Sequence, residues 1–239
     1  MTKAPHNWEI IGRQDPFYGV ITHEDFRKDK VDDDTRRRFY ESGVSDIRTV
    51  LSWFDQDLGG RPAPDAHALD IGCGVGRLCC AIATEVGHVT GYDVSDAMVA
   101  KAREAAVENM SLTTKLPAGP FDWINSYIVF QHIPTAEGLA LLDRCLAAAA
   151  PGAFLSLHFT AWRNDGPPPQ SPLARAKRGL HRLIARRFGK RAELLIDMHD
   201  YNLSDVLQRI VTRGAERLVL RHTDHNGHHG VWVLARLER

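Results

Sequence analysis

The sequence predicts an α/β fold, in which helices cover both faces of a mostly parallel, seven-stranded sheet whose last strand runs antiparallel. Three observations predict this fold. From Ala68 onward, short apolar runs alternate with stretches of helical period, a pattern typical of parallel sheets. A glycine-rich turn joins the first apolar run to a helix. The last two runs are separated by a segment containing Asn226-Gly227, a hairpin signal that makes the final strand antiparallel.

The composition is that of an ordinary globular protein. Of the 239 residues, 44% are hydrophobic and 25% are charged, which excludes wholesale disorder and collagen-like or fibrous classes. Thirty Lys and Arg balance thirty Asp and Glu, and this zero net charge argues against a protein that mainly coats nucleic-acid phosphates. Because no run of eighteen apolar residues occurs, and no apolar stretch lies near the N-terminus, we expect a cytoplasmic protein without a transmembrane segment.

Residues 1–65 are predicted to form an N-terminal extension that packs on the core. Up to about Asp34 the sequence is polar and predicts irregular structure. An amphipathic helix ending near Gly59-Gly60 is then predicted from apolar residues at i, i+3, i+4 and i+7, namely Ile47, Val50, Leu51 and Phe54. A stiff linker at 61–64 leads into the main domain, residues 66–239.

The main domain alternates strands and helices. We predict strands at 68–71, 88–93, 122–127, 153–158, 216–222 and 231–237, with a further short strand at 111–116. Helices are predicted at 76–85, 96–108, 135–149 and 204–214. Ser95 and Ser204 are placed as N-caps, where a hydroxyl accepts a hydrogen bond from the first helical turn.

A helical insertion at 161–200 follows the fifth strand. It contains nine basic and four acidic residues, a local net charge of +5. Residues 172–188 combine these charges with an apolar stripe, which predicts a basic amphipathic helix. Three interpretations stay open: a solvated surface, a lid over an anionic acceptor, or a patch for a membrane or nucleic-acid surface.

The glycine turn indicates a ligand. Gly72, Gly74 and Gly76 lack a Cβ and let backbone approach a bound molecule closely. The sixth position of a dinucleotide fingerprint is not glycine here, and no Gly-Lys-Ser/Thr of a P-loop follows. Asp70 would face a cationic group and repel a pyrophosphate. Asp93 ends the next strand, at the usual place of an acid that binds ribose hydroxyls. The predicted ligand is an adenosine with a positively charged amino-acid arm.

Four motifs in this order resemble those of the class I S-adenosylmethionine-dependent methyltransferases. The stretch Asp70-Ile71-Gly72-Cys73-Gly74-Val75-Gly76 is similar to the first motif and Gly91-Tyr92-Asp93-Val94-Ser95 to the second. The stretch Phe121-Asp122-Trp123-Ile124-Asn125-Ser126, with Phe130-Gln131-His132-Ile133, is similar to the fourth, and Pro151-Gly152-Ala153-Phe154-Leu155 to the turn into strand five. The resemblance covers 66–160, and 201–237 by strand pattern alone. It implies a Rossmann-like fold, methyltransferase activity and S-adenosyl-L-methionine as cofactor.

The resemblance also implies a set of cofactor-binding residues: Asp70, Gly72, Gly74, Gly76, Asp93, Val94, Met98 and Ser126. The glycines would shape the pocket, Asp70 and Ser126 would lie at the methionine end, and Asp93 would bind the ribose. Val94 and Met98 would flank the adenine. The chain departs from the family pattern just before the fourth strand, where many members carry an acid that reads the adenine amino group and this sequence has none.

Histidines at the carboxyl edge of the predicted sheet are candidates for catalysis and for acceptor binding. His132 follows the fourth strand, where a side chain with a pKa of about 6.5 can take a hydroxyl proton as general base. The alternative is a histidine that caps or packs the loop. His158, at the end of the fifth strand, is a candidate substrate contact, as are His199 and Tyr201 at the end of the insertion.

No metal site is predicted. The cysteines Cys73, Cys79, Cys80 and Cys145 include no CxxC pair, which favours small buried residues over a zinc cage or a disulfide framework. A second polar cluster lies in the predicted hairpin and consists of His222, Asp224, His225, His228 and His229. A solvated polar turn is favoured there over a weak site for a divalent cation.

The favoured acceptor is a small molecule. Enzymes that methylate amino groups of nucleic-acid bases carry an Asn/Asp-Pro-Pro-aromatic tetrad after strand four, where this chain has Asn125-Ser126-Tyr127-Ile128. The segment 8–22 distantly resembles leaders of bacterial saccharide methyltransferases, which implies O-methylation of a sugar hydroxyl. The alternatives are a methyltransferase for another natural product or for nucleic acid, and a non-catalytic S-adenosylmethionine-binding scaffold that docks a partner through the basic helix. The oligomeric state is left open, a homodimer included.

Overall fold

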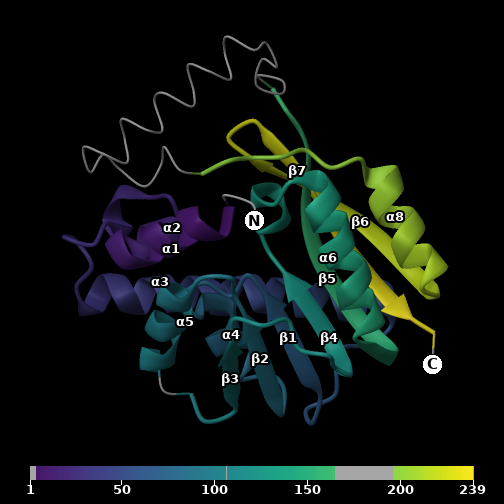
Figure 1. Ribbon diagram of the computed structural model, residues 1–239. Helices are drawn as coiled ribbons and strands as arrows, with labels where there is room; N and C mark the ends of the chain where they lie inside the picture. Colours follow the sequence, from purple (N-terminus) through teal and green to yellow (C-terminus); the bar gives the residue numbers. More distant parts are fainter. Residues whose placement is uncertain (1–3, 106, 165–195, 239) are drawn as a thin grey trace.

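The central element of the fold is a seven-stranded sheet in the order β3-β2-β1-β4-β5-β7-β6 (Figure 1). A computed structural model describes residues 4–105, 107–164 and 196–238. Its strands are β1 (His67–Ile71), β2 (His88–Tyr92), β3 (Met110–Thr113), β4 (Phe121–Ser126), β5 (Ala149–Arg163), β6 (Ala215–His225) and β7 (His228–Leu237). The first five run parallel to their neighbours, and β7 lies antiparallel between β5 and β6. The predicted fold class is confirmed.

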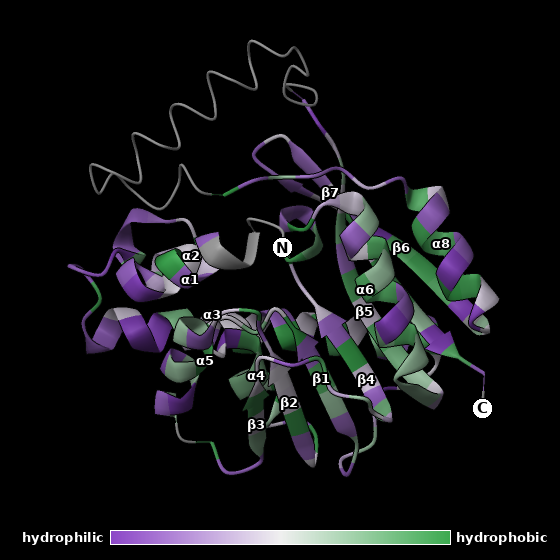
Figure 2. Ribbon diagram, viewed as in Figure 1, coloured by the Kyte–Doolittle hydropathy of each residue, from purple (hydrophilic) through white to green (hydrophobic). Residues whose placement is uncertain are grey.

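Helices cover both faces of this sheet. On one face, α6 (Thr135–Ala147) and α8 (Leu203–Thr212) contribute Leu142 and Ile210 to a buried cluster with β1, β4 and β5. On the other, α3 (Asp33–Trp53) and α4 (Arg77–Ile82) contribute Ile47 and Leu78, while α5 (Asp96–Ala102) packs beside β3. Figure 2 shows green, hydrophobic residues along the central strands. Strands buried on both faces carry continuous apolar runs rather than alternating ones, which is why the sequence shows them clearly.

The N-terminal extension is helical, and the prediction of irregular structure before Asp34 is wrong. It forms α1 (Ala4–Gln14), α2 (Pro16–Val20) and a 3₁₀ turn (Glu24–Phe26) ahead of the long α3. Ile11 and Phe17 of these helices pack in a third buried cluster with Val75 and Met98 of the main domain. Helices this short are not stable alone, so tertiary packing rather than sequence period determines them.

Helix ends follow local capping chemistry, with one correction. The predicted N-cap Ser95 is confirmed, because its hydroxyl accepts a hydrogen bond from the backbone N of Met98. The predicted N-cap Ser204 is wrong. Asn202 caps α8 instead, and its side chain accepts a hydrogen bond from the backbone N of Ser204. Because α8 begins at Leu203, Ser204 lies inside the first turn, where its own N–H needs a partner.

The fifth strand is longer than predicted. It extends from Ala149 to Arg163 rather than over 153–158, and it pairs with β7 as far as His228. The insertion therefore begins beyond Ala161. The predicted basic helix at 172–188 lies outside the described residues. Among the helices that the structure describes, none has the length and apolar character needed to cross a membrane.

Candidate functional site

The turn between β1 and α4 has a backbone conformation that favours glycine. Gly72, Gly74 and Gly76 have φ angles of 69°, 54° and 84°. A Cβ at Gly74 would lie 2.7 Å from Cγ2 of Val20 in α2. The backbone N of Gly72 donates a hydrogen bond of 2.7 Å to the carbonyl oxygen of Tyr92, which ties the turn to β2. Side chains at these positions would strain the backbone or collide with α2.

Asp93 lies beside this turn, at the carboxyl end of β2. Its carboxylate oxygens accept hydrogen bonds from the backbone N of Gly74 (2.9 Å) and of Ser95 (2.9 Å). Burial raises the pKa of Asp93, and the two N–H groups oppose part of that increase. The structure thus brings together the acid predicted to bind ribose and the glycine turn.

Asp70 is buried in β1 and its side chain is bound by the protein itself. Its carboxylate accepts hydrogen bonds from Nδ2 of Asn125 (2.8 Å) and from Sγ of Cys79 (3.3 Å). Asn125 in turn accepts a hydrogen bond of 2.7 Å from the hydroxyl of Ser156, so the network crosses three strands. Burial raises the pKa of Asp70 to about 6. Its predicted contact with the methionine end of the cofactor stays a prediction.

The remaining predicted cofactor residues differ in exposure. Val94 follows Asp93 and is 45% exposed, so its side chain is accessible to a ligand. Met98 is buried, and it packs with Ile11 and Phe17 of the N-terminal helices. Ser126 is buried at the end of β4, where its hydroxyl donates a hydrogen bond of 3.4 Å to the carbonyl of Ile71. The roles of all three at the cofactor stay predictions.

His132 lies in a 3₁₀ turn (Phe130–His132) after β4, with a defined tautomer. Its Nδ1 lies 2.9 Å from the carbonyl oxygen of Asp197, which can only accept, so Nδ1 carries the proton. Its Nε2 then accepts from the side-chain amide of Gln131 at 3.2 Å. The ring packs edge-on against Trp8 of α1, with centroids 5.2 Å apart. Burial lowers the pKa of His132 to about 4, so the imidazole is neutral at pH 7.

Gln131 was not singled out by the sequence, yet it organises this region. Its Oε1 accepts a hydrogen bond of 2.6 Å from the hydroxyl of Thr160, and its carbonyl accepts one of 2.6 Å from the backbone N of His199. Through these bonds Gln131 links the turn after β4 to β5 and to the segment before α8. The only sequence signal is a polar residue in a mostly apolar turn, which is too weak to predict such a role.

His158 is buried in β5 within an aromatic group. Its ring lies 5.3 Å from that of Tyr127 and 5.5 Å from that of Trp232, and its Nε2 is 2.8 Å from the hydroxyl oxygen of Thr223. Its Nδ1 has no hydrogen-bond partner among the described residues. Burial lowers the pKa of His158 to about 3. The sequence did not predict that Tyr127 and Trp232 contact His158, because β7 brings Trp232 to this position only in the folded sheet.

The two candidates at the end of the insertion have different surroundings. His199 is half-buried and reaches the turn after β4 through its backbone hydrogen bond to Gln131. Tyr201 is buried, its hydroxyl donates a hydrogen bond of 2.9 Å to the carbonyl of Ile133, and its ring lies against α6, where a Cβ at Gly138 would collide with it. Tyr201 therefore has a structural role, and its predicted acceptor contact stays a prediction.

The backbone is strained between β4 and the His132 turn. Ile128 has a φ of 58°, which is rare for a β-branched residue. The next residue, Val129, lies against the glycine turn, because a Cβ at Gly72 would be 2.5 Å from its Cγ1. Strain of this kind is concentrated at functional sites. Here the strained segment contacts the glycine turn through Val129 and leads on to His132.

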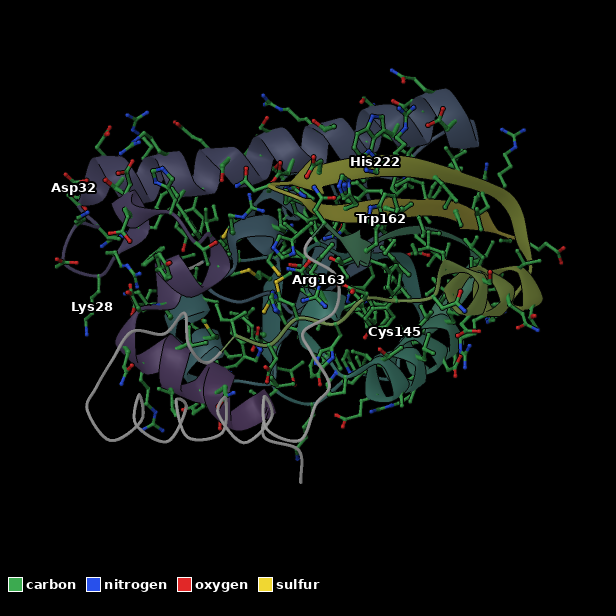
Figure 3. The ribbon with its side chains drawn as sticks, turned by 90° about the horizontal axis from the view of Figure 1, so that it is seen from above. Lys28, Asp32, Cys145, Trp162, Arg163 and His222 are labelled. Carbon is green, nitrogen blue, oxygen red and sulfur yellow. The ribbon has the colours of Figure 1, made fainter. Side chains whose placement is uncertain are left out.

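The predicted hairpin histidines pair with one another and with an exposed tryptophan. Nε2 of His222 lies 3.1 Å from Nδ1 of His229, and both rings stack on Trp162 of β5, which is 49% exposed. Figure 3 labels Trp162 on β5 and His222 on β6, the two strands that flank β7. Within the described part of the chain, no group of three or more metal-ligating side chains is placed to hold an ion.

Comparison with known proteins identifies similar chains. Residues 68–152 match a family model described as a methyltransferase domain. A ubiquinone biosynthesis O-methyltransferase of Xylella fastidiosa (strain 9a5c) is 31% identical over 105 residues, which cover 39% of this chain and 42% of that protein. The chain spans less than half the length of the curated relatives that it matches.

Two solved structures resemble nearly the whole chain. Magnesium protoporphyrin IX methyltransferase from Synechocystis PCC 6803, with bound S-adenosylhomocysteine (SAH), aligns with a TM-score of 0.60 at 19% identity, over 96% of this chain and 99% of that one. N-methyltransferase NodS from Bradyrhizobium japonicum WM9, in complex with SAH, aligns with a TM-score of 0.56 at 15% identity, over 98% and 100%. These likenesses show a shared Rossmann-like fold.

Proposed function

We propose that this chain is an S-adenosylmethionine-dependent methyltransferase that acts on a small molecule. The observation that carries the proposal is the hydrogen bond between Gly74 and Asp93, which joins the glycine turn to the predicted ribose acid. Both lie at the carboxyl ends of parallel strands, where open α/β sheets bind their ligands. Both also lie inside the segment that matches a methyltransferase domain.

The residues present fit this cofactor. The glycine turn offers backbone without side chains, and Asp93 can accept hydrogen bonds from ribose hydroxyls. When bound, S-adenosyl-L-methionine supplies an electrophilic methyl group. No carboxylate occurs between β3 and β4, so the adenine would rest on apolar contacts such as Val94 and on backbone groups.

The finer proposal is O-methylation of a saccharide hydroxyl. It is supported by the resemblance of segment 8–22 to saccharide methyltransferase leaders and by a neutral His132 in the 3₁₀ turn that follows the contact of Val129 with the glycine turn. As general base, His132 would exchange the hydrogen bond that its Nε2 accepts from Gln131 for one from the acceptor hydroxyl, and then take that proton. His158 and His199 are proposed acceptor contacts. A cytoplasmic location stays part of this proposal, and the oligomeric state is left open.

The test begins with cofactor binding. Replacement of Asp93 by Asn removes charged acceptors, so we expect calorimetry to show SAH binding weakened roughly ten-fold or more. Asp143→Asn is the matched control, because this exposed carboxylate on α6 pairs only with Arg209 in the described structure and should leave the affinity unchanged. Wild-type protein that fails to bind SAH would contradict the proposal.

Activity is tested separately. Labelled S-adenosylmethionine is incubated with a fractionated metabolite extract, and the label should appear in a small molecule and be lost with Asp93→Asn. Label on a hydroxyl oxygen of a sugar supports the finer proposal. Cofactor binding without any transfer would favour the non-catalytic scaffold.

A further inference from the structure

Helix α1 reaches both halves of the proposed site through neighbouring residues. Trp8 packs against the ring of His132, as described above, while Glu9 extends to the loop after β2. These contacts join residues that are far apart in the sequence. The N-terminal extension therefore touches the proposed base and the proposed cofactor loop together.

Glu9 makes three hydrogen bonds. Its Oε2 accepts from the hydroxyl of Ser95 (2.9 Å) and from the backbone N of Ala97 (3.1 Å), and its Oε1 accepts from Nε of Arg13 (2.9 Å). The side chain is 23% exposed. Burial raises the pKa of Glu9, but the hydrogen bonds from Ala97, Ser95 and Arg13 outweigh it and lower the pKa overall, so Glu9 is a carboxylate at neutral pH.

Ser95 connects Glu9 to the ribose acid. Its hydroxyl donates to Glu9, while its backbone N donates to Oδ1 of Asp93, whose other oxygen accepts from Gly74. The path from α1 to the glycine turn is therefore a continuous series of hydrogen bonds. Any shift of Ser95 would move the carboxylate that is proposed to face the ribose.

The cap of α5 does not itself involve Glu9. Ser95 already caps α5 by accepting a hydrogen bond from Met98, and Arg13 on the same helix could pair with Glu9 in solvent. Instead, α1 lies close to this loop: a Cβ at Gly12 would lie only 3.0 Å from Oγ of Ser95. Taking a carboxylate out of water is costly unless donors satisfy it, and the loop supplies two of them.

We infer that Glu9 is a positioning residue for the cofactor, which fixes the loop at 93–97 so that Asp93 presents its carboxylate to the ribose. The inference rests on the proposed function. It makes the N-terminal extension part of the cofactor site rather than a separate support. It also explains why a helix outside the segment that matches a methyltransferase domain packs directly on the cofactor loop.

The experiment measures SAH affinity by calorimetry for the whole 239-residue chain. Glu9→Gln keeps the shape of the side chain but removes its charge, and we expect the dissociation constant to rise about five- to thirty-fold. Glu41→Gln is the matched control, because this exposed glutamate of α3 accepts a hydrogen bond from Arg37 away from the site. The SAH affinity of this variant should equal that of wild type. Thermal unfolding without ligand is recorded for each variant.

A double-mutant cycle with Asp93→Asn separates positioning from general support. If Glu9 acts through Asp93, Glu9→Gln should weaken binding less than about two-fold in the Asp93→Asn background. Equal effects in both backgrounds, or a lowered unfolding temperature with unchanged affinity, would overturn the inference alone. A wild-type chain that binds no SAH overturns the proposed function and this inference with it.

Discussion

His132 shows how neighbours set the chemistry of a single residue. The carbonyl of Asp197 fixes its proton on Nδ1, and burial keeps the ring neutral well below the pH at which a free histidine protonates. A base with a pKa of about 4 does not ionise a sugar hydroxyl beforehand. It can still take the proton once the acceptor oxygen begins to bond to the methyl group, because that oxygen then becomes strongly acidic.

Replacement of His132 by Asn should separate catalysis from binding. Asn can still donate a hydrogen bond to the Asp197 carbonyl but cannot act as a base, so we expect kcat to fall about 10²- to 10⁴-fold with SAH affinity nearly unchanged. Steady-state kinetics with the acceptor found in the metabolite screen measure this effect. His88→Asn is the control, since His88 begins β2, away from the carboxyl edge, and its Nε2 lies 2.9 Å from the hydroxyl oxygen of Ser111 on β3. A kcat within three-fold of wild type would leave His132 with a packing role.

The same residue predicts a pH profile. If His132 is the base, as proposed, the active form is the neutral imidazole, so kcat should stay constant from about pH 8 down to about pH 5.5 and decline only as the pH falls through about 4. A decline centred near pH 6.5 would contradict the buried environment of His132.

At the scale of elements, the connections after β4 and before α8 hold His132 and His199, which are proposed to act on and to contact the acceptor. The strained Ile128 redirects the chain so that Val129 contacts the glycine turn and His132 follows in the 3₁₀ turn. The segment before α8 crosses this turn, where His199 and Tyr201 form backbone hydrogen bonds to Gln131 and Thr160. The cap of α8 therefore also anchors that segment.

The corrected cap can be tested by comparing two single substitutions. Asn202→Ala removes the side chain that accepts from the Ser204 backbone N, and we expect the free energy of unfolding to fall by about 1 kcal/mol. Ser204→Ala removes no capping bond and should cost less than about 0.5 kcal/mol. Urea denaturation of both variants measures the difference. If Ser204→Ala lowers the free energy of unfolding more than Asn202→Ala does, the N-cap is Ser204 and the correction is wrong.

At the scale of the whole molecule, stability depends on buried neutral histidines. Burial lowers the pKa of His158 to about 3, whereas in the unfolded chain it protonates at about 6.5. Below pH 6.5, His158 therefore binds a proton in the unfolded state but not in the native state. The free energy of unfolding should fall as the pH decreases from 6.5 toward 3, and His132 acts in the same direction.

His158→Phe should remove part of this pH dependence. The phenyl ring can pack among the aromatic rings of Tyr127 and Trp232, but it binds no proton. Between pH 7.5 and pH 5, the free energy of unfolding should therefore decrease by about 1–2 kcal/mol less than in wild type. Because the comparison is between two pH values, the lost hydrogen bond to Thr223 cancels. A pH dependence equal to that of wild type in His158→Phe would contradict this contribution of His158.

The succession of strands along the chain, the glycine turn and the position of Asp93 could be predicted because each depends on local sequence. Apolar runs define the buried strands, positive φ angles require glycine, and the end of β2 places Asp93 next to the turn. The hairpin at Asn226-Gly227 follows from the same kind of local preference, with φ angles of 55° and 84°.

The surroundings of the predicted side chains were decided by tertiary structure alone. The sequence placed Asp70 toward a ligand, but Asn125 and Cys79, from a neighbouring strand and from α4, hold its carboxylate inside the protein. It left 1–34 irregular, although Ile11, Phe17 and Glu9 find partners almost ninety residues away. Such contacts cannot be predicted from the sequence of either segment. The free energy of packing them arises only when the two faces meet in the folded protein and exclude water.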